Sequence, residues 1–177
     1  MKLVVLDRDG VINYDSEDFI KTPDEWRPIP GSLEAIARLT QSGWRVVVAT
    51  NQSGISRGLL DMATLNAIHA KMHRAVSQAG GRIEAVFYCP DTDESRSPCR
   101  KPNPGMFHAI ADRFNASLAD APCVGDSLRD LQAAAAVGAR PILVLTGKGK
   151  RTRGAGNLPA STTIYPDLAA VAQALCQ

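Results

Sequence analysis

The amino-acid sequence predicts an α/β fold, with one doubly wound, mostly parallel sheet of the Rossmann-like type and helices on both of its faces. Short runs rich in Val and Ile alternate with segments in which apolar residues recur every three or four positions. This alternation is typical of βαβ units. Of the 177 residues, 45% are hydrophobic and 21% are charged, as in an ordinary globular domain. We therefore expect a single domain spanning residues 1–177.

Six apolar runs are predicted to be strands, because each is short and rich in residues that suit a sheet buried on both faces. In chain order they cover residues 3–7, 44–49, 83–89, 122–126, 141–145 and, with the weakest pattern, 162–165.

Five helices are predicted between and after these strands. They cover residues 32–41, a segment capped by Asp61 that ends near Gly80, a segment with Pro104 in its first turn, a segment after Ser127, and residues 168–175. The basic, Gly-rich segment 146–156 lacks the spacing of a nucleotide-binding P-loop, so we expect a flexible solvated loop there. The three histidines fall on helical segments away from the strand ends, and none is expected to be catalytic: His69, His73 and His108.

Charge and composition indicate which class of molecule the protein binds. The net charge is +2 and the basic residues are scattered, which argues against nucleic acid and favours a small-molecule partner. No apolar stretch is long enough to span a membrane, and the N-terminus lacks the pattern of a signal peptide. We therefore expect a cytoplasmic protein without a membrane partner. We also expect it to be a monomer. Its four irregularly spaced cysteines are expected to remain reduced.

Polar residues follow several of the predicted strands, at the edge of the sheet where open α/β folds bind their ligands. Asp7 and Asp9 end the first strand, Thr50 and Asp126 end two others, and Lys101 follows a polar loop after the third. Each signal is weak alone, but together they predict a site at this edge.

The residue types at this edge suit phosphoryl transfer. Carboxylates held close together disfavour each other's ionised forms, and a bound cation offsets the repulsion. We therefore expect Asp7 and Asp126 to bind Mg²⁺, with Lys101 and Thr50 facing an anion. A metal ion, an ammonium group and a hydroxyl around one carboxylate stabilise a transferring phosphoryl group, so Asp7 is the natural nucleophile.

Two other uses of acidic motifs fit less well. An EF-hand loop needs a further acidic or amide position before its glycine, whereas Gly10 follows Asp9 directly. A receiver domain of two-component signalling carries similar residues, but in a different chain order and in a shorter chain.

The order Asp-x-Asp, Thr, Lys and Gly-Asp-x-x-x-Asp resembles the haloacid dehalogenase (HAD) superfamily of phosphohydrolases, and the resemblance spans nearly the whole chain. It implies that Asp7 is the nucleophile and that Asp9 is the general acid and base. Thr50 and Lys101 would bind the phosphoryl group.

The same resemblance implies the metal ligands. Mg²⁺ would be held by Asp7, Asp126 and the backbone carbonyl of Asp9, with Asp130 orienting the ligands. Ion-pumping ATPases of the superfamily carry Thr at the position of Asp9, and an Asp there favours hydrolysis because it can protonate the leaving alkoxide and then activate water. The intervals between the motifs leave no room for a large cap domain.

Three loops remain to select the substrate. The stretches DRDGVIN, TNQSGISRG, YCP and CRKPNPGMF resemble the group of heptose bisphosphate phosphatases and histidinol phosphatases, and the first of these more closely. This implies removal of the 7-phosphate of D-glycero-D-manno-heptose 1,7-bisphosphate, a step toward the inner core of lipopolysaccharide. The residues implied to contact the sugar and its second phosphate are Asp15, Ser16, Glu17, Asp18, Asn51, Gln52, Ser53, Arg57 and Arg100. An Arg beside Lys101 suits a bisphosphate, because its planar fork can hold a phosphate bidentately.

The chain departs from this group at the loop that usually binds zinc through Cys-x-His and Cys-x-Cys. Cys89 and Cys99 remain, but Asp91 and Ser97 occupy the other two positions. Two thiolates do not make a closed zinc site without further ligands, so we expect no structural zinc.

Two alternatives stay open on the sequence alone. Histidinol phosphate is a rival substrate for the same chemistry. A non-hydrolytic protein that binds or transfers phospholigands on the same scaffold is disfavoured, because every catalytic position is filled.

Overall fold

A computed structural model describes residues 1–177, and its centre is a six-stranded sheet in which every pair of neighbouring strands is parallel. The strand order is β3-β2-β1-β4-β5-β6. The strands are β1 (Leu3–Leu6), β2 (Arg45–Asn51), β3 (Ile83–Cys89), β4 (Pro122–Gly125), β5 (Arg140–Val144) and β6 (Thr163–Tyr165). The predicted α/β class and all six predicted strands are confirmed, with ends that differ by two residues or fewer.

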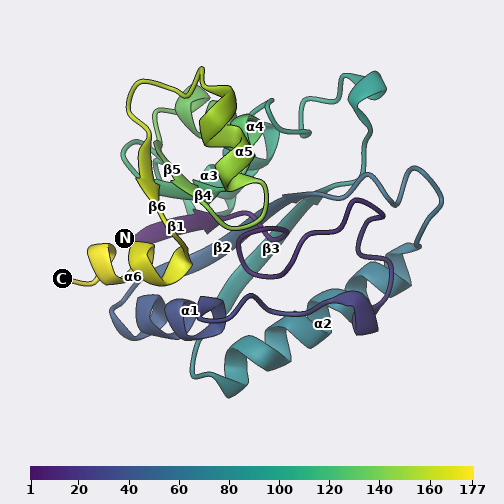
Figure 1. The fold of residues 1–177 in the computed structure, drawn as a ribbon, viewed down its shortest axis with the longest axis horizontal. Coiled ribbons are helices and arrows are strands. Elements are labelled where there is room, and N and C mark those ends of the chain that lie inside the picture. The colour runs from purple at the N-terminus through teal and green to yellow at the C-terminus, as the bar shows by residue number, and fades with distance from the viewer.

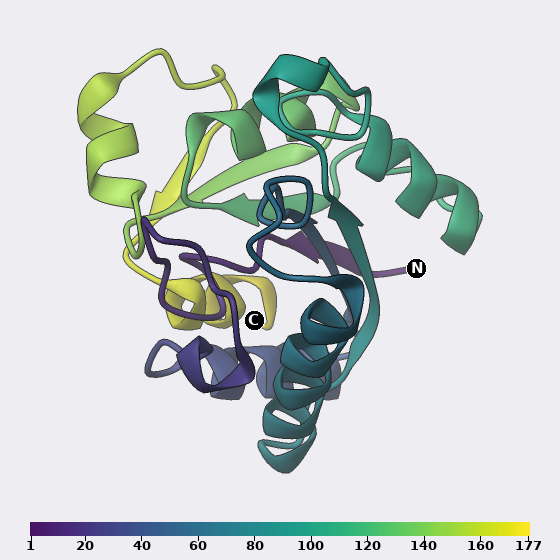
Figure 2. The same cartoon turned by 90° about the vertical axis from the view of Figure 1, so that its right-hand side faces the viewer.

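Helices cover both faces of the sheet (Figures 1 and 2). They are α1 (Ser32–Gln41), α2 (Met62–Gln78), α3 (Gly105–Phe114), α4 (Leu128–Ala136), α5 (Gly149–Ala155) and α6 (Leu168–Leu175). One layer consists of α1, α2 and α6, and α3 and α4 lie in the other. Asp61 caps α2 as predicted, because its side chain accepts a hydrogen bond from the Thr64 N–H.

The alternation of side chains along β1 divides the core into two parts. Val4 and Leu6 belong to the cluster beneath α1, α2 and α6. Leu3 and Val5 belong to the cluster beneath α3 and α4. Because β1 is buried on both sides, it forms a rigid support for the residues that follow it.

The expectation of a flexible loop over residues 146–156 is wrong, since α5 occupies Gly149–Ala155. Its glycines disfavour a helix in isolation, but tertiary hydrogen bonds hold it. The Thr152 hydroxyl donates to the backbone carbonyl of Asp126 at 2.7 Å, and the Lys148 N–H donates to Oδ2 of Asp126 at 2.9 Å. None of the helices combines the length and the apolar character that crossing a membrane requires.

Candidate active site

A cleft of about 220 Å³ opens at the carboxyl edge of β1, β2 and β4. All four predicted catalytic residues line it, together with Asp126 and Asp130. Of the nine residues predicted to contact the sugar and second phosphate, only Asp18 lies outside and instead lines a neighbouring hollow. The parallel sheet therefore brings the separate motifs of the sequence together.

Asp7 follows β1 directly, and its backbone N–H donates to the Val124 carbonyl of β4 at 2.9 Å. Oδ1 of its side chain accepts hydrogen bonds from the Arg8 N–H at 2.9 Å and from Lys101 Nζ at 3.1 Å. Oδ2 accepts none. Burial raises the pKa of Asp7 to about 7, and repulsion from Asp130 and Asp9 adds to this effect against the attraction of Lys101.

Lys101 is almost fully buried and has three oxygen partners. Its ammonium donates to the Ala49 carbonyl at 2.8 Å and to Asp7 at 3.1 Å, and it lies 2.7 Å from Oδ1 of Asp130. Burial alone would lower the pKa of Lys101, but the two carboxylates raise it above its ordinary value, so the side chain stays charged. It also holds the pKa of Asp130 below the usual range, although burial opposes this.

Asp126 and Asp130 belong to the turn between β4 and α4. Oδ2 of Asp130 accepts from the backbone N–H groups of Asp126 and Ser127 and from the Ser127 hydroxyl, which forms a capping box at the start of α4. Burial raises the pKa of Asp126 to about 8, with added repulsion from Asp130 and Asp7. Asp130 thus orients both the backbone of this turn and Lys101.

The acidic cluster fits a divalent metal ion. Asp7, Asp126 and Asp130 each present a carboxylate oxygen within 4.8 Å of the others. Burial, with added repulsion from neighbouring carboxylates, raises two of their pKa values, and a hard cation with oxygen ligands would stabilise the ionised forms and relieve that repulsion. The backbone is shaped around the group, because a Cβ atom at Gly10 or Gly147 would collide with the Asp126 carboxylate.

Asp9 is held beside this cluster by side-chain amides and a guanidinium group. Its Oδ1 accepts from Arg8 Nε at 2.8 Å and Asn13 Nδ2 at 2.9 Å, and its Oδ2 accepts from Gln52 Nε2 at 3.1 Å. Burial raises the pKa of Asp9, but the charge of Arg8 and these hydrogen bonds lower it by more. The Gln52 amide also donates to the Thr50 hydroxyl at 2.9 Å, which links these two predicted residues.

The outer part of the cleft carries the predicted arginines. The Nε atom of Arg100 donates to Asp93 at 2.7 Å, and its Nη1 donates to the Asp91 carbonyl at 3.1 Å. Arg57 lies on the facing loop, and its Nε atom donates to the Ser53 hydroxyl at 3.4 Å. Both guanidinium groups are thus held by neighbouring residues at the cleft.

Five further residues line the cleft but were not among the predicted site residues: Phe19, Ile20, Ser127, Arg129 and Lys148. Arg129 lies inside the Gly-Asp-x-x-x-Asp motif, so its place in the first turn of α4 could have been inferred. Lys148 lies in the segment expected to be a loop. Its Nζ lies 3.5 Å from Oδ2 of Asp15, which joins two sides of the cleft.

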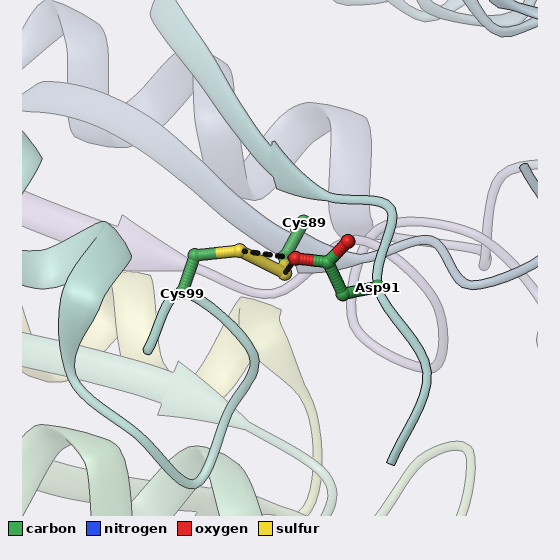
Figure 3. A group of neighbouring side chains, drawn as sticks. All are labelled: Cys89, Asp91 and Cys99. Carbon is green, nitrogen blue, oxygen red and sulfur yellow. Dashed lines mark hydrogen bonds between the residues drawn. A yellow bond between two sulfur atoms is a disulfide. The ribbon is translucent and has the colours of Figure 1, made fainter. Parts of the chain in front are cut away.

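The expectation of four reduced thiols is also wrong, because Cys89 and Cys99 form a disulfide (Figure 3). Irregular spacing along the chain concealed this pairing. Cys89 ends β3 and Cys99 precedes the Arg-Lys pair, and the fold brings their Cα atoms to 5.8 Å, within the range that a disulfide bridges. Oδ2 of Asp91 lies 3.7 and 3.6 Å from the two sulfur atoms. The loop carrying Asp93 is therefore closed at its base.

Two family models match the chain. One, described as polynucleotide kinase 3 phosphatase, matches residues 2–131, and one described as HAD-hydrolase-like matches residues 98–171. Together they span every motif that lines the cleft.

Heptose bisphosphate phosphatases from several bacteria resemble this chain over most or all of its length. D-glycero-beta-D-manno-heptose-1,7-bisphosphate 7-phosphatase from Bordetella bronchiseptica is 60% identical, with 100% of this chain and 99% of the relative covered. The Escherichia coli protein of the same name is 38% identical over 82% of this chain and 80% of the relative.

Two solved structures of such phosphatases superpose on this chain. The D,D-heptose 1,7-bisphosphate phosphatase from B. bronchiseptica, complexed with magnesium and phosphate, superposes with a TM-score of 0.97 at 60% identity, covering 99% of this chain and 98% of that one. The enzyme from Burkholderia thailandensis gives a TM-score of 0.80 at 59% identity, with the same coverage.

Proposed function

Since the chain belongs to the heptose 1,7-bisphosphate phosphatase family of HAD-type hydrolases, we propose that it removes the 7-phosphate of D-glycero-β-D-manno-heptose 1,7-bisphosphate with the help of Mg²⁺. One observation supports the chemistry above all others. Oδ1 of Asp7 is bound by Lys101 and by the Arg8 N–H, while Oδ2 accepts no hydrogen bond from the protein. The free oxygen is the one that attacks phosphorus.

In the first half of the reaction, Oδ2 of Asp7 forms a bond to the phosphorus and the bond from phosphorus to the sugar oxygen breaks. Asp9 enters this step as the carboxylic acid, although Arg8 and its hydrogen bonds lower its pKa in the substrate-free protein, and it gives its proton to the leaving oxygen. In the second half, Asp9 takes a proton from water, the resulting hydroxide attacks the aspartyl phosphate, and inorganic phosphate leaves with Asp7 restored.

The metal ligands would be the carboxylates of Asp7 and Asp126 and the backbone carbonyl of Asp9, with Asp130 as the residue that orients them. When bound, Mg²⁺ supplies positive charge that offsets the carboxylates and the phosphoryl oxygens. Lys101 and the Thr50 hydroxyl hold the transferring phosphoryl group. Lys101 is suited to this because Asp7, Asp130 and the Ala49 carbonyl fix its ammonium in place.

Substrate choice is assigned to the loops around the cleft. Arg57 and Arg100 would hold the phosphate that is not transferred. The sugar would lie against the loop after Tyr14 and the loop after Thr50, and the residues assigned to it are Asp15, Ser16, Glu17, Asn51, Gln52 and Ser53. Asp18 lies outside the cleft and is not assigned to the sugar. The side chain of Asn51 also donates a hydrogen bond to the Lys101 carbonyl and accepts one from the Lys101 N–H. These bonds connect the loop assigned to the sugar with the residue assigned to the phosphoryl group.

We also propose the oligomeric state and the cellular compartment in which the protein acts. The protein would act as a monomeric domain of residues 1–177 in the cytoplasm, without nucleic acid, on a path to the inner core of lipopolysaccharide. A sugar bisphosphate is too highly charged to cross a membrane unaided, so its synthesis and use belong to one compartment.

The test is phosphate release from both anomers of heptose 1,7-bisphosphate and from histidinol phosphate, with Mg²⁺ or with a chelator. We expect turnover of the β anomer to exceed that of histidinol phosphate and to stop in chelator. Asp7→Asn should lower kcat at least on the order of 10³-fold, whereas Asp112→Asn, an exposed change on α3, should not. Faster turnover of histidinol phosphate, or activity in Asp7→Asn, would contradict the proposal.

A further inference from the structure

A fully buried guanidinium group lies behind Asp9. Arg8 follows β1 and has no solvent-exposed surface. Its Nε donates to Oδ1 of Asp9 at 2.8 Å. Its Nη2 lies 2.8 Å from the same oxygen, although without hydrogen-bond geometry. A buried charge of this kind is costly unless it is paired and hydrogen-bonded. The second side-chain partner of the Arg8 guanidinium therefore helps to determine where the group lies.

That partner is His69 on α2. Its Nε2 lies 3.1 Å from Nη1 of Arg8. An arginine can only donate hydrogen bonds, so Nε2 must accept and the proton of the imidazole must reside on Nδ1. His69 is almost fully buried, and burial together with the nearby Arg8 charge lowers its pKa to about 3. The ring is therefore neutral and suited to accept.

The contact bears on the orientation of the Asp9 carboxylate. Oδ1 accepts from Arg8 and from Asn13, while Oδ2 accepts only from Gln52. Arg8 thus fixes one oxygen, while the other contacts Gln52, a residue that lines the cleft. Because the arginine side chain has many rotamers, an acceptor at its far end restricts the guanidinium to the one that meets Asp9.

We propose that His69 is a positioning residue for the reaction: it holds Arg8 so that the Asp9 carboxylate faces the leaving oxygen of the substrate. The inference deepens the proposed function and rests on it for the role of Asp9. A merely structural histidine would stabilise α2 against β1 and leave the chemistry of the leaving group unaffected.

The leaving group separates these two roles. A sugar alkoxide needs a proton in order to leave, whereas nitrophenolate leaves without one, so misplacement of Asp9 should harm only the first reaction in the step that kcat/KM reports. His69→Leu removes the acceptor, and His69→Gln retains one. His73→Leu, one turn further along α2 on an exposed position, serves as the matched control.

We expect His69→Leu to lower kcat/KM for the heptose bisphosphate about tenfold or more, a part of the 10²- to 10⁴-fold that acid–base catalysis contributes. The value for p-nitrophenyl phosphate should fall less than about threefold, His69→Gln should recover most of the loss, and His73→Leu should resemble the unmodified protein. Equal losses on both substrates, or no loss in His69→Leu, would overturn the proposal.

A crystal structure of His69→Leu, or of His69→Gln if the leucine variant does not fold, tests the inference without any substrate. We expect displaced Arg8 and Asp9 side chains in the leucine variant and their present positions in the glutamine variant. Unchanged side chains in His69→Leu, or displaced ones in His69→Gln, would refute the positioning role. Failure of the unmodified protein to hydrolyse heptose bisphosphate would instead refute the proposed function.

Discussion

The ammonium of Lys101 lies 2.7 Å from Oδ1 of Asp130, and both side chains are at least nine-tenths buried. This ion pair joins the loop after β3 to the first turn of α4 across the carboxyl edge of the sheet. The same ammonium donates a hydrogen bond to Asp7. One positive charge therefore offsets the negative charges of two buried carboxylates.

Removal of that charge should be costly to the fold. We predict that Lys101→Met lowers the free energy of unfolding by about 3–5 kcal/mol in the absence of metal, because it leaves buried carboxylates unpaired. Adding Asp130→Asn should recover part of the loss. Urea denaturation in chelator measures both values, and Lys150→Met on the exposed side of α5 is the control, expected within about 0.5 kcal/mol. Losses that simply add in the double variant would contradict the prediction.

The metal-free protein should lose stability as the pH rises from about 6.5 to 8.5. Asp7 and Asp126 have folded-state pKa values of about 7 and about 8, above their ordinary values. In this window the folded state therefore binds more protons than the unfolded state, and stability falls with pH by roughly 1 kcal/mol per unit. His69, whose pKa is lowered to about 3, adds stability only as the pH rises to about 6.5.

Chemical denaturation in chelator at several pH values measures this slope. Saturating Mg²⁺ should flatten it, because the bound ion replaces the protons. A metal-free protein that gains stability over the same window would show that burial and repulsion do not raise the pKa values of these carboxyls.

Gly147 should be needed for metal binding rather than only for the turn. It has a positive φ of 54°, and a Cβ there would collide with the Asp126 carboxylate and crowd the Gly10 backbone. Gly138 has a positive φ of 71° with nothing near its Cβ position, so Gly138→Ala is the matched control. Both alanine variants should lose about 1–2 kcal/mol of stability from backbone strain.

Only Gly147→Ala should also weaken Mg²⁺ binding, by about tenfold or more, because it displaces Asp126, a proposed metal ligand. Isothermal titration with Mg²⁺ measures the affinity. Equal affinities in the two alanine variants would mean that the Asp126 carboxylate tolerates the added methyl group.

The Cys89–Cys99 disulfide should stabilise the loop that positions Arg100. It closes a segment with a sequence separation of 10, for which loop closure predicts about 2–3 kcal/mol. We expect Cys99→Ser to lower the free energy of unfolding by that amount and to raise KM for the bisphosphate, since Asp93 and the Asp91 carbonyl hold Arg100. Cys176→Ser, which alters a free cysteine, is the control.

Alkylation of the denatured protein counts its thiols directly, and two should react where four would react after reduction. Four reactive thiols before reduction would contradict the pairing. A cytoplasm keeps most thiols reduced, so the same count on protein trapped by acid inside cells reports which state functions there.

The grouping of three candidate site residues at one edge of the sheet could be predicted, because each of them follows a strand that the sequence itself indicates. Asp7, Thr50 and Asp126 each follow an apolar strand, and parallel strands end at a common edge. The requirements of phosphoryl transfer then explain why carboxylates and a hydroxyl group lie together.

The features that escaped prediction depend on contacts between distant parts of the chain. His69 meets Arg8 across 61 positions, and nothing near either residue in the sequence signals the pairing. Helix α5 forms in a Gly-rich segment because Asp126 anchors Thr152 and Lys148. Neither the contact of His69 with Arg8 nor the formation of α5 can be inferred from the helix or strand propensity of the local sequence.

The position of β1 in the sheet sets the order in which the protein can become an enzyme during its synthesis. Strand β1 pairs with β2 on one side and with β4 on the other, so the first strand to leave the ribosome must wait for residues 122–130. A nascent chain that ends at β3 already carries Asp7, Asp9 and Thr50, yet it lacks Lys101, Asp126 and Asp130. It has the proposed nucleophile but no counter-charge, and we therefore expect it not to react with cellular phosphate esters before its fold is complete.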